Sequence, residues 1–416
     1  MKLKLVLVIL FTMIFTSFIE AKENKKENKK VEVVNSVNSI ERKEFRAVWV
    51  ASVGNIDWPS EKGLSISEQK QEFIEILENV KKWNMNAVVV QIKPAADSFY
   101  PSKYAPWSAY LTGTQGKDPG YDPLKFMVDE AHKRGIEFHA WFNPYRVGIT
   151  TDTTKLSKDN IAFSKPKWMI KYGGKLYLNP GEPGVDDYVV DEIMEVVNNY
   201  DIDGVHMDDY FYPYKVKDQE YPDQSTYSQY GKKFYNVGDW RRDNVNRLIE
   251  KLSTEIKKAK PNVQFGISPF GVWRNKSTDP VNGSATKAGV QNYDDLYADI
   301  VHWMDKGWVD YVAPQIYWNQ GFSLADYDTL VEWWSDEAKK TKTDLYIGQA
   351  AYKVKEWQDD NELVSQVEFN RIFPEVKGSI FFSYSSLLEN PKGITSKLME
   401  GPYSKKKKNE TICLYL

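Results

Sequence analysis

The chain has 416 residues, with 55 lysines and arginines against 58 aspartates and glutamates, which gives a formal net charge of −3. This balance excludes a general electrostatic attraction to nucleic acid or to an anionic membrane. The single cysteine, Cys413, excludes an intramolecular disulfide framework and a cysteine-rich zinc or iron–sulfur site. Aromatic residues make up 14% of the chain, more ring surface than an ordinary core needs. The length allows two or three domains, or one large α/β barrel.

The first residues predict export from a bacterial cell. Lys2 and Lys4 precede an apolar run over residues 5–18, and Ala21 offers a cleavage end, so residues 1–21 are typical of a signal peptide. The run is shorter than the roughly 20 residues of a membrane-spanning helix. An uncleaved anchor is the alternative, because residues 19–21 fit the small-residue cleavage rule poorly. No cysteine lies near the cleavage end, which argues against a lipid anchor.

Residues 22–43 are rich in Lys, Glu and Asn and predict a disordered polar tether. After the tether, eight apolar segments alternate with longer helical patterns, which predicts a (β/α)8 barrel over residues 44–400 and no second domain. Residues 401–416 form a basic tail. The predicted strands are 45–53, 86–93, 137–143, 204–212, 264–273, 311–318, 345–352 and 379–384. The predicted helices begin near Ser67, Asp122, Asp186, Asp239, Asp294, Leu324 and Asn361.

Long loops follow the second, third and fourth strands, at residues 94–121, 144–186 and 213–238. In this fold the loops at the carboxyl ends of the strands build the active site, so the extra length lies on the functional face.

Two neighbouring aspartates, Asp208 and Asp209, lie at the end of the fourth predicted strand. Side chains alternate along a strand, so His206, Asp208 and Tyr210 are expected to point into the barrel mouth, with Asp209 at its rim. Paired carboxylates suit the cleavage of a glycosidic bond, since one protonates the leaving oxygen while the other stabilises or captures the sugar carbon. Each charge also raises the pKa of its neighbour. The alternative is that these residues only cap the loop or bind a backbone amide.

Other polar and aromatic residues at strand ends are candidates for substrate binding. His139 is equally consistent with a packed core histidine. His132 and His302 fall on predicted helices, so the strand ends carry no His-x-His pair and a hydrolytic zinc site is not expected. No motif predicts a cofactor. The substrate-binding candidates are Asp57, Trp58, Gln91, Lys93, His139, Asn143, Arg146, His206, Tyr210, Arg274, Gln315, Tyr317 and Trp318.

Aromatic residues gather in the same loops and predict a long stacking cleft for sugar rings, although any one of them is more often a core residue. These residues are Trp58, Tyr100, Tyr104, Trp107, Tyr145, Tyr210, Tyr212, Trp273, Tyr317 and Trp318.

A series of motifs runs in order along the chain, at residues 45–50, 55–59, 91–94, 139–146, 208–212, 266–269, 273–275 and 313–318. Together these motifs resemble the bacterial glycosyl-hydrolase-like family ten. The resemblance implies a (β/α)8 glycoside hydrolase of the bacterial envelope. One member, at the division site of Gram-negative cells, cleaves peptidoglycan strands already stripped of their peptides. The absence of a lipoprotein cysteine here puts the same tethering in doubt.

Residues 203–210 are also similar to the fourth strand of chitinase-type barrels, which use the N-acetyl group of the substrate as the nucleophile. His206 and Tyr210 stand where those enzymes carry an inner aspartate and the acid glutamate. If the substrate assists, Asp208 would orient the acetamido group. Another carboxyl must then be the acid, with Asp209, Asp57 and Asp97 as the candidates.

The sequence therefore predicts an exported hydrolase of glycan strands made of N-acetylated amino sugars, with peptide-free peptidoglycan as the first candidate substrate. Asp208 has the electrostatic or nucleophilic role and Asp209 is the first candidate for acid and base. His139, Asn143, Arg146, Gln315 and Tyr317 hold sugar groups, and Trp318 stacks, in this hypothesis. The alternatives are a hydrolase of another polysaccharide, a non-catalytic glycan-binding barrel and, more weakly, an amidase or deacetylase.

Overall fold

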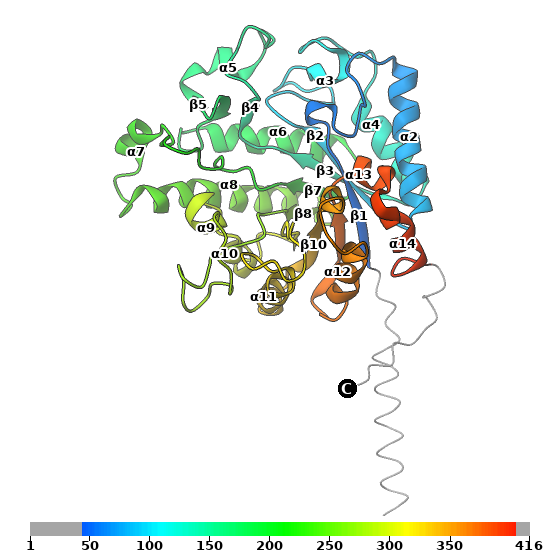
Figure 1. Ribbon diagram of the computed structural model, residues 1–416. Coiled ribbons are helices and arrows are strands. Elements are labelled where there is room, and N and C mark those ends of the chain that lie inside the picture. The colour runs from blue at the N-terminus through cyan, green and yellow to red at the C-terminus, as the bar shows by residue number, and fades with distance from the viewer. Residues whose placement is uncertain (1–43, 405–416) are drawn as a thin grey trace, which may run out of the picture. The chain divides into compact units, whose positions relative to one another are not determined.

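Eight parallel strands close into a barrel in the computed structural model, which describes residues 44–404 (Figure 1). The predicted (β/α)8 fold is confirmed. Several predicted strands run too far at their carboxyl ends; the fourth was expected to reach Tyr212 but ends at Met207, because the chain there turns into the loop that carries the aspartates. In barrel order the strands are β1 (Phe45–Val50), β2 (Ala87–Lys93), β3 (Glu137–Phe142), β7 (Gly204–Met207), β8 (Gln264–Ile267), β9 (Tyr311–Val312), β10 (Asp344–Gln349) and β11 (Val376–Phe381).

Helices surround the barrel and begin close to the predicted positions. The side chain of Ser65 caps the first long helix, and Glu68 completes a reciprocal capping box. Asn236, rather than Asp239, caps the helix after the fourth barrel strand. The long helices are α2 (Ile66–Lys82), α4 (Pro123–Lys133), α6 (Val185–Asn199), α8 (Val237–Ala259), α11 (Tyr327–Lys339) and α12 (Glu362–Asn370). The shorter ones are α3 (Ala109–Thr112), α5 (Ile161–Ser164), α7 (Gln224–Tyr230), α9 (Asn292–Asp295), α10 (Ile300–Asp305), α13 (Tyr384–Glu389) and α14 (Ile394–Glu400).

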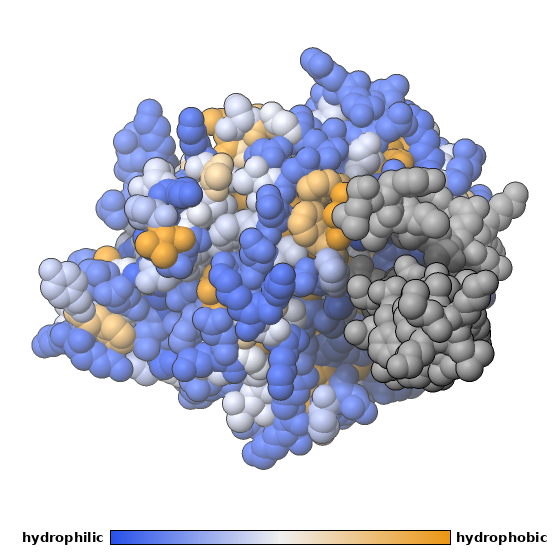
Figure 2. All heavy atoms as spheres, turned by 90° about the horizontal axis from the view of Figure 1, so that it is seen from below, coloured by the Kyte–Doolittle hydropathy of each residue, from blue (hydrophilic) through white to orange (hydrophobic). Residues whose placement is uncertain are grey.

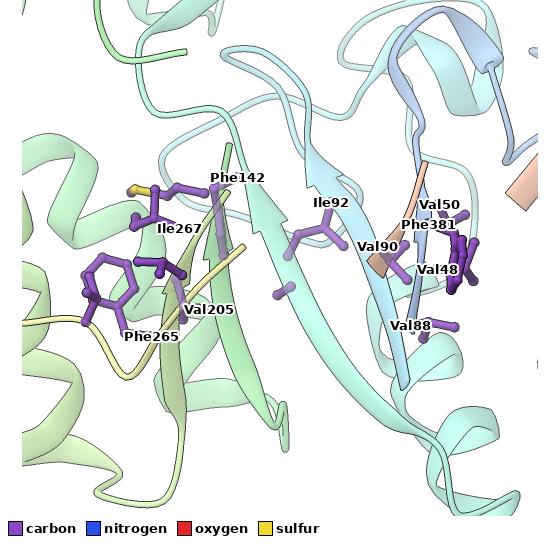
Figure 3. Close-up of a cluster of buried hydrophobic side chains, with 14 of the residues drawn as sticks. Val48, Val50, Val88, Val90, Ile92, Phe142, Val205, Phe265, Ile267 and Phe381 are labelled. Atoms are coloured by element: carbon purple, nitrogen blue, oxygen red, sulfur yellow. The ribbon is translucent and has the colours of Figure 1, made fainter. Parts of the chain in front are cut away.

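Alternating side chains along the strands form two apolar layers. The outward-facing set packs between the barrel and the helices and includes Val48, Val90 and Val205 (Figure 3). The inward-facing set includes Trp49 and Trp141 and fills the barrel itself. Burial of both sets accounts for the near-continuous apolar character of the strands, which is why they can be recognised in the sequence.

A three-stranded antiparallel sheet lies in the long loop after β3 and was not predicted. Its order is β4 (Arg146–Gly148), β6 (Lys175–Leu178) and β5 (Met169–Tyr172), and Figure 1 shows it near α5. Strands of three or four residues carry too little alternation to stand out in the sequence. This sheet fixes the position of Arg146, one of the candidate site residues.

Among residues 44–404, no helix has the length and apolar character needed to cross a bilayer. The face shown in Figure 2 is mainly hydrophilic, with hydrophobic residues in separate groups. The predicted signal peptide at 1–21, the tether at 22–43, Cys413 and the tail beyond residue 404 lie outside the described residues, so these assignments stay predictions.

Candidate active site

Asp208 follows β7 directly and points into the mouth of the barrel, as the alternation of side chains predicts. Its Oδ2 accepts hydrogen bonds from Trp141 Nε1 (3.2 Å) and Asn143 Nδ2 (2.5 Å) at the end of β3. Its Oδ1 accepts a hydrogen bond from the backbone N–H of Tyr210 (3.0 Å). Three donors therefore surround a carboxylate that is only 6% exposed. Such donors favour its ionised form and hold its orientation.

Asp209 is also buried, beside the charge of Asp208. Burial and the neighbouring Asp208 raise the pKa of Asp209 to about 7. The Tyr214 hydroxyl donates to Asp209 Oδ2, and Gln315 adds a second side-chain hydrogen bond. Burial raises the pKa of Asp208 as well, but the nearby Arg146 guanidinium and the three N–H donors oppose that rise. Of the two, Asp209 is thus the carboxyl that keeps a proton near neutral pH.

Arg146 is the positive charge that acts most on Asp208. Its guanidinium lies over the ring of Tyr210, 4.7 Å from the centroid, and donates to the carbonyl of Pro94 (3.2 Å). β4 holds it in place at the barrel mouth. Arg146, Asn143 and Gln315 are therefore gathered with the aspartate pair, as predicted from their positions at strand ends.

Partly exposed aromatic rings border the aspartate pair. One row runs from Tyr210 to Tyr214 (5.6 Å between centroids), then to Phe270 (6.2 Å) and Trp318 (5.4 Å). Rings of this kind can stack on the apolar faces of sugars. A second group consists of Tyr317, Tyr352 and Phe382.

Sequence reasoning identified Tyr210, Tyr317 and Trp318 in these two groups but missed four of the rings. Tyr214 lies in a loop where no strand pattern fixes the direction of a side chain. Phe270, Tyr352 and Phe382 lie beyond the observed ends of β8, β10 and β11 but within the predicted strands, and the alternation along those strands could have identified them as inward-facing.

Half of the ten aromatic residues assigned to the stacking cleft are buried instead. Trp58 is 0% exposed, donates through Nε1 to the carbonyl of Gln69 (2.9 Å) and packs on Phe73 and Phe99. Its substrate-binding assignment is therefore corrected to a core role, because no face of its ring is open. The other buried members are Tyr100, Tyr145, Tyr212 and Trp273.

Lys93 turns away from the barrel mouth. The register of β2 on β3 shifts between Gln91 and Lys93, so Lys93 pairs with Phe142 and faces the helices. There it forms a buried ion pair with Glu192 of α6 (2.9 Å). Burial raises the pKa of Glu192, and Lys93 opposes that rise. The prediction that Lys93 contacts substrate is thus overturned by this irregularity in the strand.

His139 and His206 are both 0% exposed and lie deeper in the barrel than Asp208. Each places Nδ1 2.9 Å from the hydroxyl of Tyr311, and Trp49 Nε1 donates to His206 Nε2 (3.2 Å). Burial keeps the pKa of His206 well below its usual value. The predicted substrate contacts of both histidines are corrected to a buried network. Gly266 makes room for it, because a Cβ there would meet the Tyr311 ring at about 2.0 Å.

Asp57 and Arg274 are occupied by contacts within the fold. Asp57 Oδ2 accepts from the N–H of Ala51 (2.7 Å), and its Oδ1 accepts from the Ser383 hydroxyl and the N–H of Ser385 (both 2.8 Å). It therefore ties the loop after β1 to Ser383 and to the start of α13. Arg274 pairs with Asp279 and Asp294.

Asp97, the other candidate acid, is buried in the loop after β2. Its side-chain partners Ser108 and Gln115 belong to the same loop. Within residues 44–404, no group of three or more His, Cys, Asp or Glu side chains is arranged to hold a metal ion.

Comparison with known proteins shows to which family the chain belongs. Residues 44–366 match the family described as Glycosyl hydrolase-like 10. Glycosyl hydrolase YngK of Bacillus subtilis is 58% identical over 382 residues, covering 90% of this chain and 75% of that protein. Glycosyl hydrolase DigH of Escherichia coli K12 is 43% identical over 363 residues, covering 81% of this chain and 82% of that protein.

Solved structures with low sequence identity share the fold. The glycoside hydrolase domain of PgaB (BpsB) from Bordetella bronchiseptica has a TM-score of 0.56 at 13% identity, covering 85% of this chain and 98% of that one. The catalytic domain of β-amylase from Paenibacillus polymyxa has a TM-score of 0.55 at 12% identity, covering 88% and 99%. With the family match over most of the barrel and the buried aspartate pair at its mouth, the chain belongs to the glycosyl hydrolase-like 10 family and is a glycoside hydrolase.

Proposed function

We propose that this glycoside hydrolase is exported and cleaves glycan strands of N-acetylated amino sugars, with peptide-free peptidoglycan as its substrate. The observation that carries the proposal is the buried Asp208–Asp209 pair, in which the two carboxyls have different surroundings beneath partly exposed aromatic rings. Carboxyls whose environments separate their pKa values are suited to separate acid and charge-stabilising roles.

Asp209 is the general acid in this proposal. A pKa of about 7 keeps it largely protonated in mildly acidic solution, so that it can give its proton to the leaving glycosidic oxygen. The hydrogen bond from Tyr214 holds the carboxyl in one orientation. After the bond breaks, the same group can take a proton from water.

Asp208 stabilises the positive charge that develops at the sugar carbon. Its carboxylate is held by three N–H donors and lies near the Arg146 guanidinium. It would either act on the sugar carbon directly or orient the acetamido group of the substrate, which then serves as the nucleophile. The similarity of residues 203–210 to the chitinase-type strand supports the role in which Asp208 orients the acetamido group. It also supports an N-acetylated amino sugar as the substrate.

The aromatic rings favour a chain of sugars over a small glycoside. Phe270 and Trp318 continue the row of rings that starts at Tyr210 and Tyr214, and Tyr317 contacts Phe382 in the second group. An extended platform suits several consecutive rings of a strand that carries no peptides. The apolar run at residues 5–18 supports export to the compartment where such strands occur.

The test is digestion of a substrate panel followed by mass spectrometry of the products. The panel contains denuded peptidoglycan strands, peptide-bearing peptidoglycan, chitin oligosaccharides and an unrelated β-glucan. New reducing ends on denuded strands by the wild type, and none by Asp208→Asn, are the expected result. Cleavage of the β-glucan alone would move the substrate to another polysaccharide. Binding of strands with no cleavage of any member would contradict the hydrolytic proposal.

A further inference from the structure

Gln91 was predicted to contact substrate, but the structure buries it behind Asn143. The side chain lies at the end of β2, is 1% exposed and connects the loop after β1 to the end of β3. Its Oε1 accepts hydrogen bonds from the backbone N–H groups of Ser52 (3.1 Å) and Val53 (2.9 Å). Its Nε2 donates to Asn143 Oδ1 (2.5 Å). Asn143 Nδ2 donates in turn to Asp208 Oδ2 (2.5 Å).

The backbone fixes the direction of this series of hydrogen bonds. An N–H group can only donate, so the atom of Gln91 that faces Ser52 and Val53 must be the oxygen. Its nitrogen then faces Asn143, whose side-chain oxygen must accept. This leaves the nitrogen of Asn143 directed at Asp208. Two amides, whose orientations would otherwise be free to reverse, are therefore set by two backbone groups of the neighbouring strand's loop.

We propose that Gln91 is a positioning residue for Asp208, acting through Asn143 to keep a hydrogen-bond donor directed at the carboxylate. Ser52, Gln91, Asn143 and Asp208 lie at the carboxyl ends of β1, β2, β3 and β7, which are consecutive in the barrel. Through this series of hydrogen bonds, the backbone after β1 determines which atom of Asn143 faces the Asp208 carboxylate. The inference rests on the proposed function for the role of Asp208 in hydrolysis.

A carboxyl at position 91 makes the relay sensitive to pH. In Gln91→Glu, a protonated carboxyl can still donate to Asn143 and the native direction is kept. Once it ionises it can only accept, so the Asn143 amide must reverse and present its oxygen to Asp208 Oδ2. Two facing acceptors disfavour the Asp208 carboxylate. The ionisable groups that face Asp208, or that lie in the loop after β1 next to Gln91, are Asp57, Arg146, Asp209, Tyr210, Tyr214 and Tyr317.

The kinetic test is the ratio of kcat for Gln91→Glu to kcat for wild type, measured on denuded strands from pH 4 to pH 8. The ratio removes the part of the pH dependence that the two proteins share. We expect it to approach one at low pH and to fall about tenfold to a hundredfold as the pH rises, with KM changed less than about twofold. A ratio independent of pH, or a higher KM with unchanged kcat, would overturn the proposal.

Gln69→Glu is the matched control. Gln69 is a buried glutamine on α2 whose Nε2 donates to Leu64 O (2.9 Å) and whose Oε1 accepts from the Tyr121 hydroxyl (2.9 Å). This substitution also removes a buried amide donor from the fold, but no series of hydrogen bonds connects residue 69 to Asp208. Its kcat ratio is expected to show no pH dependence beyond that of its stability.

A second variant tests the inference if Gln91→Glu does not fold, and a second measurement tests it without relying on the proposed function. Gln91→Met keeps a side chain of similar length but has no donor, so it is the second variant if Gln91→Glu fails to fold. It should lower kcat at every pH with KM changed less than about twofold, and an unchanged kcat would overturn the proposal. Carbon-13 NMR of labelled aspartate carboxyls, with the Asp208 signal assigned by Asp208→Asn, follows Asp208 without any substrate. A rise of about 1 in the Asp208 pKa is expected in Gln91→Glu, a tenfold change in ionisation. An unchanged Asp208 titration overturns the relay even if strands are cleaved, whereas a wild type that cleaves no glycan overturns only the proposed function.

Discussion

Replacement of Asp209 by asparagine is expected to stabilise the folded protein while removing its acid. The carboxyl is 5% exposed and its pKa rises from about 3.8 to about 7 on folding. A raised pKa means that the folded state holds this proton more tightly than the unfolded state does. The carboxyl therefore costs almost no stability below about pH 3, an increasing amount as the pH rises to about 7, and a nearly constant amount above.

The full cost is at most about 4 kcal/mol, because a tenfold difference in proton affinity between the folded and unfolded states corresponds to about 1.4 kcal/mol. Asp209→Asn keeps an oxygen for the Tyr214 hydroxyl, so its main effect is to remove the charge. The free energy of unfolding of the variant should then exceed that of wild type by less than about 1 kcal/mol at pH 4 and by up to about 4 kcal/mol at pH 8.

Urea unfolding at several pH values between pH 4 and pH 8 measures this difference, provided that the two proteins have equal m-values. Asp305→Asn, at an exposed position on α10, is the control and should show no such growth with pH. A difference that stays constant across the pH range, or a wild type that is the more stable protein at pH 8, would refute the electrostatic account of the pair.

Three further substitutions separate core residues from the cleft. Trp58→Ala should lower the free energy of unfolding by about 3–5 kcal/mol and leave KM unchanged, as chemical unfolding and kinetics on denuded strands can show, since the ring is enclosed. Trp318→Ala should do the reverse, raising KM about tenfold with a small change in stability; an unchanged KM would remove it from the cleft. Lys93→Met should destabilise by about 3–5 kcal/mol, because it leaves Glu192 buried without its partner, and adding Glu192→Leu should restore most of that stability in urea unfolding. A Lys93→Met protein as stable as wild type would contradict the buried pair.

The barrel could be predicted because its strands are buried on both faces and its helices carry caps and regular apolar spacing. The same alternation correctly placed Asp208 inside the mouth and Val205 outside. It failed for Lys93, where one irregular residue pair in β2 reverses the direction of the side chain.

The sequence could not predict which side chains in the loops are buried. Trp58 and Trp318 both follow barrel strands and have the same chemistry, but the loop after β1 folds Trp58 onto α2 while Trp318 stays partly exposed. The partners of a histidine likewise depend on the opposite side of the barrel, since His139 and His206 meet at Tyr311 of β9. Such contacts join residues more than a hundred positions apart, and no local pattern records them.

The central claim is that Asp209 donates the proton and Asp208 supplies the charge in glycosidic cleavage. The most direct measurement compares Asp209→Asn with wild type on denuded strands and on an aryl glycoside of N-acetylglucosamine, whose phenolate leaves without a proton. The account predicts that kcat/KM falls by about 10²–10⁴ on the strands and far less on the aryl glycoside. It also predicts that wild-type activity on the strands falls as the pH rises through about 7. Equal losses on both substrates, or full activity of the variant on the strands, would contradict it.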